Sequence, residues 1–190
     1  MRTRSVLDND IEKVMISEDE LEEIVTRVAA EIDRDYSTME GKLLLLCILK
    51  GSVVFMGDLM KKISLPVEID FMKVSSYGSG TVSNGKPTIM LDLHRSDLSD
   101  CNVLIIEDIV DSGRTLQYLM EYLKLKGARS IRTATLLDKP SRRVVDLEAD
   151  YRGVVIPDEF VVGYGLDYAE RYRELSYIGI LRPEVYENIH

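Results

Sequence analysis

Three acids, a glycine and two hydroxyl side chains stand close together in the segment VLIIEDIVDSGRT, residues 103–115. Its last part, DSGRT at residues 111–115, would present backbone N–H groups, two hydroxyls and an arginine to an anion at the start of a helix. The adjacent acids Glu107 and Asp108 repel each other, so a polyol or a cation is needed to explain them. A ribose 5-phosphate meets both requirements, because its phosphate fits the turn while its 2- and 3-hydroxyls reach the acids. Any one of these residues alone would be an ordinary solvated side chain, but together they predict a sugar-phosphate site.

Other nucleotide-binding and catalytic patterns do not account for the chain. The stretch GTVSNGK, residues 80–86, has the spacing of a P-loop, but Pro87 replaces the required Ser or Thr and a strand is expected to follow. The dinucleotide pattern G-x-G-x-x-G is absent. The two histidines, His94 and His190, offer little for a Ser-His-Asp hydrolase. Two cysteines are too few for a disulfide framework or a four-cysteine metal site.

Alternating strand and helix patterns place the acidic segment in an α/β fold. Residues 103–107 are typical of a buried strand, and residues 115–128 have the period of a helix that Gly127 would stop. The other expected elements are strands at 43–49, 66–74, 88–93 and 130–137 and helices at 17–36 and 52–63. This order predicts a central, mostly parallel twisted sheet flanked by helices. Because such sheets bind ligands at the carboxyl ends of their strands, we expect the acids and the turn at that edge.

The apolar periodicity also predicts which side chains face the core. The helix at 17–36 begins with Ser17 and Glu20 at the spacing of a capping box. The side chains expected to face inward are Leu21, Ile24, Val25, Val28 and Ile32 in this helix, Val53, Met56, Met60 and Ile63 in the helix at 52–63, Val67, Ile69 and Phe71 in the strand at 66–74, and Leu116, Leu119, Met120 and Leu123 in the helix at 115–128.

Two segments are predicted to border the functional edge. SSYGSGTVSNGKP, residues 75–87, holds three glycines and four serines and too few apolar groups to pack, which indicates a mobile loop. The strand at 88–93 is expected to return beside the strand at 66–74 and form a hairpin around that loop. The tail at 151–181 has short strands and many tyrosines, and we expect it to cap the same edge.

Composition and charge are those of one compact cytoplasmic domain. A chain of 190 residues with 45% hydrophobic content can bury a sizeable core. We expect one domain over residues 1–190, with a core of about 36–155 and a hood built from the N-terminal segment and about 156–190. The longest apolar run, residues 43–49, is far shorter than the roughly 20 residues that span a bilayer, and no secretory signal is recognisable. The net charge of -9 argues against nucleic-acid binding, so any phosphate site must be local.

The segment VLIIEDIVDSGRT resembles the phosphoribosyl-diphosphate signature of type I phosphoribosyltransferases, and specifically that of the hypoxanthine-guanine branch. Four further segments resemble the same branch and follow one another in the order found there. They are LKG at 49–51, SSYGSG at 75–80, LLDKPSRR at 136–143 and PDEFVVGYGLDYAERYRELSYIG at 157–179. The resemblance implies the type I phosphoribosyltransferase fold and a purine salvage enzyme that uses Mg²⁺. Such an enzyme moves the 5-phosphoribosyl group of 5-phospho-α-D-ribosyl 1-diphosphate (PRPP) to N9 of hypoxanthine or guanine, giving IMP or GMP and diphosphate.

The resemblance further implies roles for single residues. Asp111 would exchange a proton with purine N7, and the Leu49–Lys50 bond is a candidate non-proline cis peptide. The sugar phosphate would be bound by Glu107, Asp108, Asp111, Ser112, Gly113, Arg114 and Thr115, the diphosphate by Lys50, Gly51 and Arg173, and Mg²⁺ by Asp167 with Glu107 and Asp108. Ser76 and Tyr77 would belong to a loop that closes over the sugar. Some relatives carry Thr and Lys where this chain has Ser112 and Arg114, and both replacements keep a hydroxyl and a cation.

The purine would be held by three residues with different implied contacts. Lys139 would donate to the 6-oxo group, Phe160 would stack on the base, and Val161 would contact the purine edge through its backbone. Without the resemblance, Lys139 would be an exposed loop residue, and Phe160 could equally be a core residue. Hypoxanthine, guanine and xanthine all remain candidate acceptors.

Two other functions stay open on the sequence. A uracil phosphoribosyltransferase that regulates transcription by binding RNA shares the sugar-phosphate turn, but it would need a basic surface, and the net charge here is -9. A nucleotide sensor without catalysis could keep the turn and would have no need for Asp111 or a closing loop. Relatives of the resembled branch form dimers or tetramers, so we expect a homodimer or a homotetramer. His94 and Arg95 lie where the resemblance is weaker, and it assigns them no role.

Overall fold

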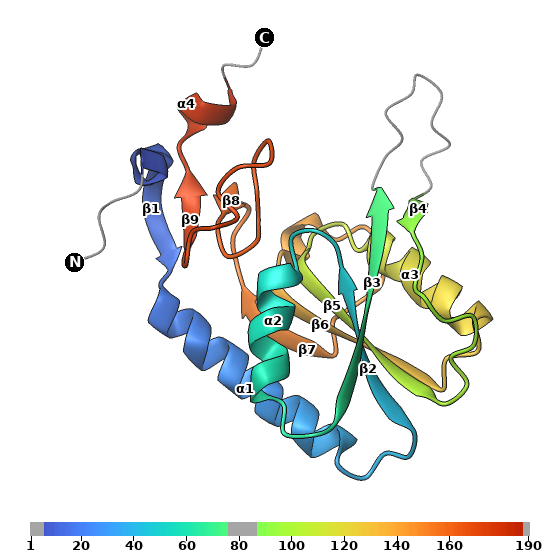
Figure 1. The fold of residues 1–190 in the computed structure, drawn as a ribbon. Coiled ribbons are helices and arrows are strands. Elements are labelled where there is room, and N and C mark those ends of the chain that lie inside the picture. Colours follow the sequence, from blue (N-terminus) through green and yellow to red (C-terminus); the bar gives the residue numbers. More distant parts are fainter. Residues whose placement is uncertain (1–5, 76–86, 188–190) are drawn as a thin grey trace.

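The computed structural model describes residues 6–75 and 87–187, which form two β-sheets (Figure 1). The larger sheet has the strand order β4-β3-β2-β5-β6-β7, and every neighbouring pair is parallel except β3 with β4. Its strands are β2 (Lys42–Ile48), β3 (Val67–Ser75), β4 (Thr88–Leu91), β5 (Cys101–Val110), β6 (Ser130–Asp138) and β7 (Tyr151–Val155). The predicted central, mostly parallel sheet is confirmed.

Helices cover both faces of this sheet. α1 (Glu18–Tyr36) and α2 (Val53–Lys62) pack on one face, and α3 (Arg114–Leu125) packs on the other (Figure 1). α1 begins with the predicted capping box, in which the Glu20 N–H donates to Ser17 Oγ at 3.3 Å and the Ser17 N–H donates to Glu20 Oε2 at 2.7 Å. Within the described residues, no helix is long and apolar enough to cross a membrane.

The continuous apolar run of β2 follows from this layering. Leu45 and Cys47 point into the layer of α1 and α2, whereas Leu44 and Leu46 point into the layer of α3. All four side chains have no exposed surface. A strand covered on both faces has no solvent side, so its sequence does not alternate between apolar and polar residues.

A second, antiparallel sheet of three strands joins the two ends of the described chain (Figure 1). Its order is β1-β9-β8, with β1 (Ile11–Ile16), β8 (Val161–Val162) and β9 (Ile178–Leu181). The short helices are η1 (Val6–Asp10), η2 (Pro140–Arg142) and α4 (Pro183–Tyr186). Of the N-terminal segment, only η1 and β1 lie with this sheet. α1 packs on the larger sheet, so the core begins earlier than the predicted boundary at about residue 36.

The inward face predicted for the helix at 52–63 is only partly correct. Val53 and Met60 are 44% and 37% exposed. Six of the ten residues of α2 are apolar, so its periodicity is compatible with more than one inward face. Packing selects the face that buries the aromatic ring of Phe55, and the buried residues of α2 are Phe55, Met56 and Leu59.

The inward face predicted for β3 also differs from the structure. Val67 and Phe71 are partly buried against the α1 and α2 layer, but Ile69 between them is 46% exposed. Met72, on the opposite face, is fully buried in the α3 layer. β3 lies next to the edge strand, where α1 and α2 cover the sheet incompletely.

Arg95, which has no role by resemblance, links two strands of the larger sheet. Its guanidinium pairs with Glu68 in β3 and donates to Cys101 Sγ, at the start of β5, at 3.2 Å. These contacts lie near the amino ends of the strands, which indicates a structural role.

Candidate functional site

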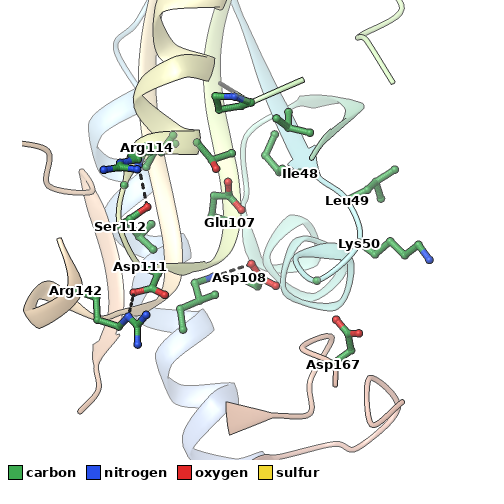
Figure 2. Close-up of a pocket in the computed structure, with 18 of the residues that line it drawn as sticks. Ile48, Leu49, Lys50, Glu107, Asp108, Asp111, Ser112, Arg114, Arg142 and Asp167 are labelled. Atoms are coloured by element: carbon green, nitrogen blue, oxygen red, sulfur yellow. Dashed lines mark hydrogen bonds and ion pairs between the residues drawn. The ribbon is translucent and has the colours of Figure 1, made fainter. Parts of the chain in front are cut away.

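A cleft of about 600 Å³ lies at the carboxyl ends of β2 and β5, the edge that the sequence pattern predicts for a ligand (Figure 2). It brings together the predicted sugar-phosphate and diphosphate residues. Among the residues that line it are Lys50, Gly51, Glu107, Asp108, Asp111, Ser112, Gly113, Arg114, Thr115, Arg142, Asp167 and Arg173.

The turn at residues 111–115 has the form expected of an anion site. Gly113 precedes α3 with φ of 79°, a left-handed conformation that favours glycine. A Cβ at this position would lie 2.7 Å from Val145 Cγ2, so the turn also needs glycine for space. The N-cap residue Gly113 makes no side-chain hydrogen bond to the first turn of α3, and the Arg114 N–H donates only over a long distance, 3.4 Å, to Ser112 Oγ, so this turn can still offer N–H groups to a phosphate.

Glu107 and Asp108 lie within β5 rather than at its end, because pairing with β6 continues to Val110. Glu107 is 9% exposed, and burial raises its pKa well above the ordinary range, with the Asp108 charge adding to the effect. Burial also raises the pKa of Asp108 to about 6, although the hydrogen bond that its carboxylate accepts from the Ile109 N–H lowers this pKa. Glu107 is buried and Asp108 is partly buried, so ionisation of both side chains is disfavoured, and hydroxyl donors or a cation in the cleft would stabilise their ionised forms.

Replacing Asp108 by Asn is expected to stabilise the protein at neutral pH. Raising a carboxyl pKa from 3.8 to about 6 costs the ionised folded state about 3 kcal/mol above pH 6, since one pKa unit is worth about 1.4 kcal/mol. Below the unfolded value of 3.8 the carboxyl is protonated in both states and this cost disappears. The advantage of Asn should therefore shrink as the pH falls.

Melting temperatures of the two proteins at about pH 7.5 and about pH 4, with a chelator present, test this expectation. The variant should melt several degrees higher at neutral pH, because 1 kcal/mol shifts Tm by about 2–4 °C in a domain of this size. The same Tm difference at both pH values would show that the raised pKa of Asp108 is not its cause.

The turn after β2 is packed between the acids and the C-terminal segment. The Leu49–Lys50 peptide bond is cis, so this prediction is confirmed. A Cβ on Gly51 would lie 1.5 Å from Asp108 Oδ2. On the other side, a Cβ on Gly165 would lie 2.1 Å from the Gly51 carbonyl oxygen. Glycine at both positions therefore lets the turn approach the acidic part of the cleft.

Ion pairs connect the residues at the diphosphate end of the cleft. Arg173 Nη2 lies 2.8 Å from Asp167 Oδ1 and 3.4 Å from Glu170 Oε2. Lys50 Nζ pairs with the same Glu170 oxygen at 2.9 Å, and Figure 2 shows its side chain pointing away from Asp108. Glu170 is thus a charged neighbour of two predicted diphosphate residues, and neither motif nor spacing indicated it.

The predicted purine residues do not line the cleft. Lys139 follows β6, is 8% exposed, and donates from Nζ to the Glu159 carbonyl oxygen at 2.6 Å. Phe160 is 39% exposed and stacks on Tyr186 with a centroid distance of 4.8 Å. Val161 is buried at the start of β8. The structure therefore places the Lys139 ammonium against the Glu159 carbonyl, one residue before Phe160.

Arg142 is a cleft residue to which neither a motif nor the resemblance assigned a role. Its Nε lies 3.0 Å from Asp111 Oδ1 (Figure 2). It is the last residue of η2, and the next residue, Arg143, pairs instead with the buried Asp138. Two consecutive arginines give no periodicity from which to decide which one faces the cleft.

The predicted closing loop falls largely outside the described residues. β3 and β4 pair in antiparallel fashion, with Ser75 opposite Thr88, so the hairpin prediction is confirmed. Ser76 and Tyr77 lie between these strands, in the part of the chain that the structure does not describe.

Known proteins resemble this chain over nearly its whole length. The family model described as phosphoribosyl transferase domain matches residues 17–169. The hypoxanthine-guanine phosphoribosyltransferase of Bacillus subtilis is 51% identical over 183 residues, which is 96% of this chain and 100% of that protein. A crystal structure of a hypoxanthine phosphoribosyltransferase from Staphylococcus aureus matches with a TM-score of 0.91 and 48% identity, covering 98% of this chain and 100% of the other.

A second type of relative is much longer. The bifunctional protein TilS/HprT of Listeria monocytogenes is 55% identical over 179 residues, which is 94% of this chain but 27% of that protein. The chain thus spans about a quarter of the length of these bifunctional relatives.

Proposed function

The chain belongs to the phosphoribosyl transferase domain family, in its hypoxanthine-guanine branch, and we propose that it is a purine salvage enzyme. It transfers the 5-phosphoribosyl group of PRPP to N9 of hypoxanthine or guanine and releases diphosphate, with IMP or GMP as the product. The relatives reported above are named for hypoxanthine or for hypoxanthine and guanine. The uracil-specific, RNA-binding alternative has no support among them.

The observation that carries the proposal is the arrangement of two anion sites around a pair of acids. Figure 2 shows Ser112 and Arg114 of the phosphate turn on one side of the cleft, Lys50 on the other, and Glu107 and Asp108 between them. Gly51 and Arg173 also line the cleft. PRPP has the same order of groups, with a 5-phosphate, a ribose carrying two free hydroxyls, and a diphosphate.

The acids act on the sugar during transfer. As the bond between C1 of the ribose and the diphosphate oxygen breaks, positive charge develops on the ring, and the new bond forms between C1 and purine N9. Carboxylates close to that ring stabilise the charge, because they are fixed in a partly buried site where electrostatic interactions are strong. Glu107 and Asp108 also accept hydrogen bonds from the ribose hydroxyls.

Asp111 exchanges the proton of the purine. It is the first residue of the phosphate turn, and it lines the cleft with its side chain 47% exposed, so a purine can reach it. It accepts the proton from N7 in the forward direction and returns it in the reverse direction.

Mg²⁺ is the proposed cofactor, and the donors of the cleft fit it. Among the described residues, no group of three or more His, Cys, Asp and Glu side chains is arranged to hold a metal. The available donors are carboxylate oxygens, namely Asp167 with Glu107 and Asp108, and Mg²⁺ accepts one or two such ligands together with substrate phosphates. When bound, Mg²⁺ supplies charge neutralisation for the leaving diphosphate.

The place and assembly of the enzyme are parts of the same proposal. We propose a cytoplasmic homodimer or homotetramer. The exposed Val53 and Met60 of α2 support self-association, because they add apolar surface on a helix whose opposite side is already packed.

Product formation from PRPP and Mg²⁺ with hypoxanthine, guanine, xanthine, adenine and uracil, each offered separately, tests the function. Turnover is expected with 6-oxopurines only, because Lys139 is a donor and suits an oxo group, whereas the 6-amino group of adenine is itself a donor. The relative rates then give the preference among the 6-oxopurines.

Two results would contradict the proposal. Conversion of uracil alone would leave the sugar-phosphate turn in place but exclude the purine site at Lys139 and Phe160. Absence of turnover with every base, combined with nucleotide binding, would favour the alternative function of a non-catalytic nucleotide sensor.

A further inference from the structure

The backbone after β6 runs along the loop that carries Asp111. The Lys139 N–H donates to the Val110 carbonyl oxygen at 3.0 Å, and the Val144 N–H donates to the Ser112 carbonyl oxygen at 3.1 Å. These two hydrogen bonds lie on either side of Asp111. The turn between them is therefore held against the loop by main-chain contacts.

Arg142, in that turn, connects Asp111 to Lys139 through Asp158. Its Nε lies 3.0 Å from Asp111 Oδ1, and its Nη1 donates to both carboxylate oxygens of Asp158 at 3.3 Å. Asp158 Oδ1 in turn lies 3.6 Å from Lys139 Nζ. Negative and positive side chains alternate along this row of four.

Stability does not explain the row. The side chains of Asp111, Arg142 and Asp158 are 47%, 53% and 52% exposed, and ion pairs with this exposure contribute little to folding. Lys139, by contrast, is largely buried, with its ammonium fixed by the Glu159 carbonyl. The row therefore joins a largely buried cation at one end to a carboxylate at the other end whose side chain is half-exposed in the cleft.

The chemistry of a 6-oxopurine gives this connection a purpose. N7 and the 6-oxo group lie on the same edge of the base, so the groups that meet them must keep a constant separation. On the proposed function, these groups are Asp111 and Lys139. We propose that Arg142, held by Asp158, is a positioning residue that fixes the Asp111 carboxylate relative to Lys139, so that both groups meet one purine edge.

Replacing Arg142 by Gln tests the proposal. The kcat with hypoxanthine or guanine should fall about tenfold. Misplacing a reacting group by about 1 Å can cost on the order of 10²-fold, and a smaller loss is expected here because main-chain hydrogen bonds still hold the loop of Asp111. Arg142→Lys should recover part of the lost kcat, since it keeps the positive charge but not the planar guanidinium group. If the Gln variant does not fold, the kcat of the Lys variant is compared with that of the wild type instead. The KM for PRPP should change less than about twofold in either variant, because the phosphate turn is untouched.

A double variant separates positioning from general damage. In an Asp111→Asn background, Arg142→Gln should cost less than about twofold, because a residue that acts through Asp111 has nothing left to position. Arg129→Gln is the matched control. It breaks a similar exposed pair, Arg129 with Glu40 at 2.8 Å, before the start of β6, and should leave turnover unchanged.

The inference is overturned if Arg142→Gln turns over like the wild type, or if its loss is undiminished in the Asp111→Asn background. Either result leaves the proposed reaction intact. Absence of turnover by the wild type would instead reject the proposed function, so the two failures are distinguishable.

Discussion

Asn in place of Asp111 should lower the kcat of phosphoribosyl transfer by about 10²–10⁴-fold, the usual contribution of a general acid or base. Asn has almost the same shape, but its amide cannot accept the proton that leaves the purine. The turn at 112–115 would keep its glycine and its available N–H groups, so IMP and GMP should still bind with nearly wild-type affinity. Loss of turnover with retained product binding is thus the expected signature.

Steady-state rates and a product titration on the same preparation measure both quantities. Asp146→Asn is the control, because it removes the same charge from an exposed residue that does not line the cleft. Its rates and affinities should equal those of the wild type. Unchanged turnover in Asp111→Asn would remove this carboxylate from the proton step, and equal losses of turnover and product affinity would assign it to binding.

The part of the site that could be predicted is the part encoded by neighbouring residues. The acids of β5, the turn at 111–115 and the start of α3 are consecutive in the chain, so their types and spacing specify a strand, a turn and a helix N-terminus. Gly113 and Gly127 both have positive φ at the two ends of α3, as expected for a tight turn and a helix stop. Only the end of β5 was predicted wrongly, because acidic residues are disfavoured within a buried strand. Glu107 and Asp108 nevertheless lie within β5, and their pKa values are raised there.

The contacts that could not be predicted join distant segments. Arg142 reaches Asp111 from a turn after the next strand, and Lys50 meets Glu170 across 120 positions of sequence. Such pairs depend on how the elements pack, and a charged residue in a polar loop shows no periodicity that reveals its partner. The roles of Lys139, Phe160 and Val161 came through the resemblance alone, since each has an equally good explanation as a surface or core residue.

Alanine at position 51 should lower kcat/KM for PRPP by about 10²-fold or more. The new Cβ would lie 1.5 Å from Asp108 Oδ2 and 2.6 Å from its Cγ, so the whole carboxylate has to move and not merely one oxygen. That movement would break the 2.8 Å hydrogen bond from the Ile109 N–H. The turn cannot easily retreat either, because its carbonyl is in close contact with Gly165. The variant would thus displace an acid of the sugar site and the diphosphate turn together, and displacements of about 1 Å are enough for losses of this size.

Gly57→Ala provides the matched control, because Gly57 lies in α2 and a Cβ there would meet no atom within 4 Å. This variant should keep wild-type kinetics and gain up to about 1 kcal/mol of stability, since alanine favours a helix interior over glycine. Circular dichroism and Tm on both variants confirm that they fold before rates are compared. Wild-type kcat/KM in the Gly51 variant would mean that the turn can open without disturbing Asp108. A fall in kcat/KM with PRPP that leaves IMP affinity unchanged would instead place the damage at the diphosphate end, where the two glycines hold the turn against the acids.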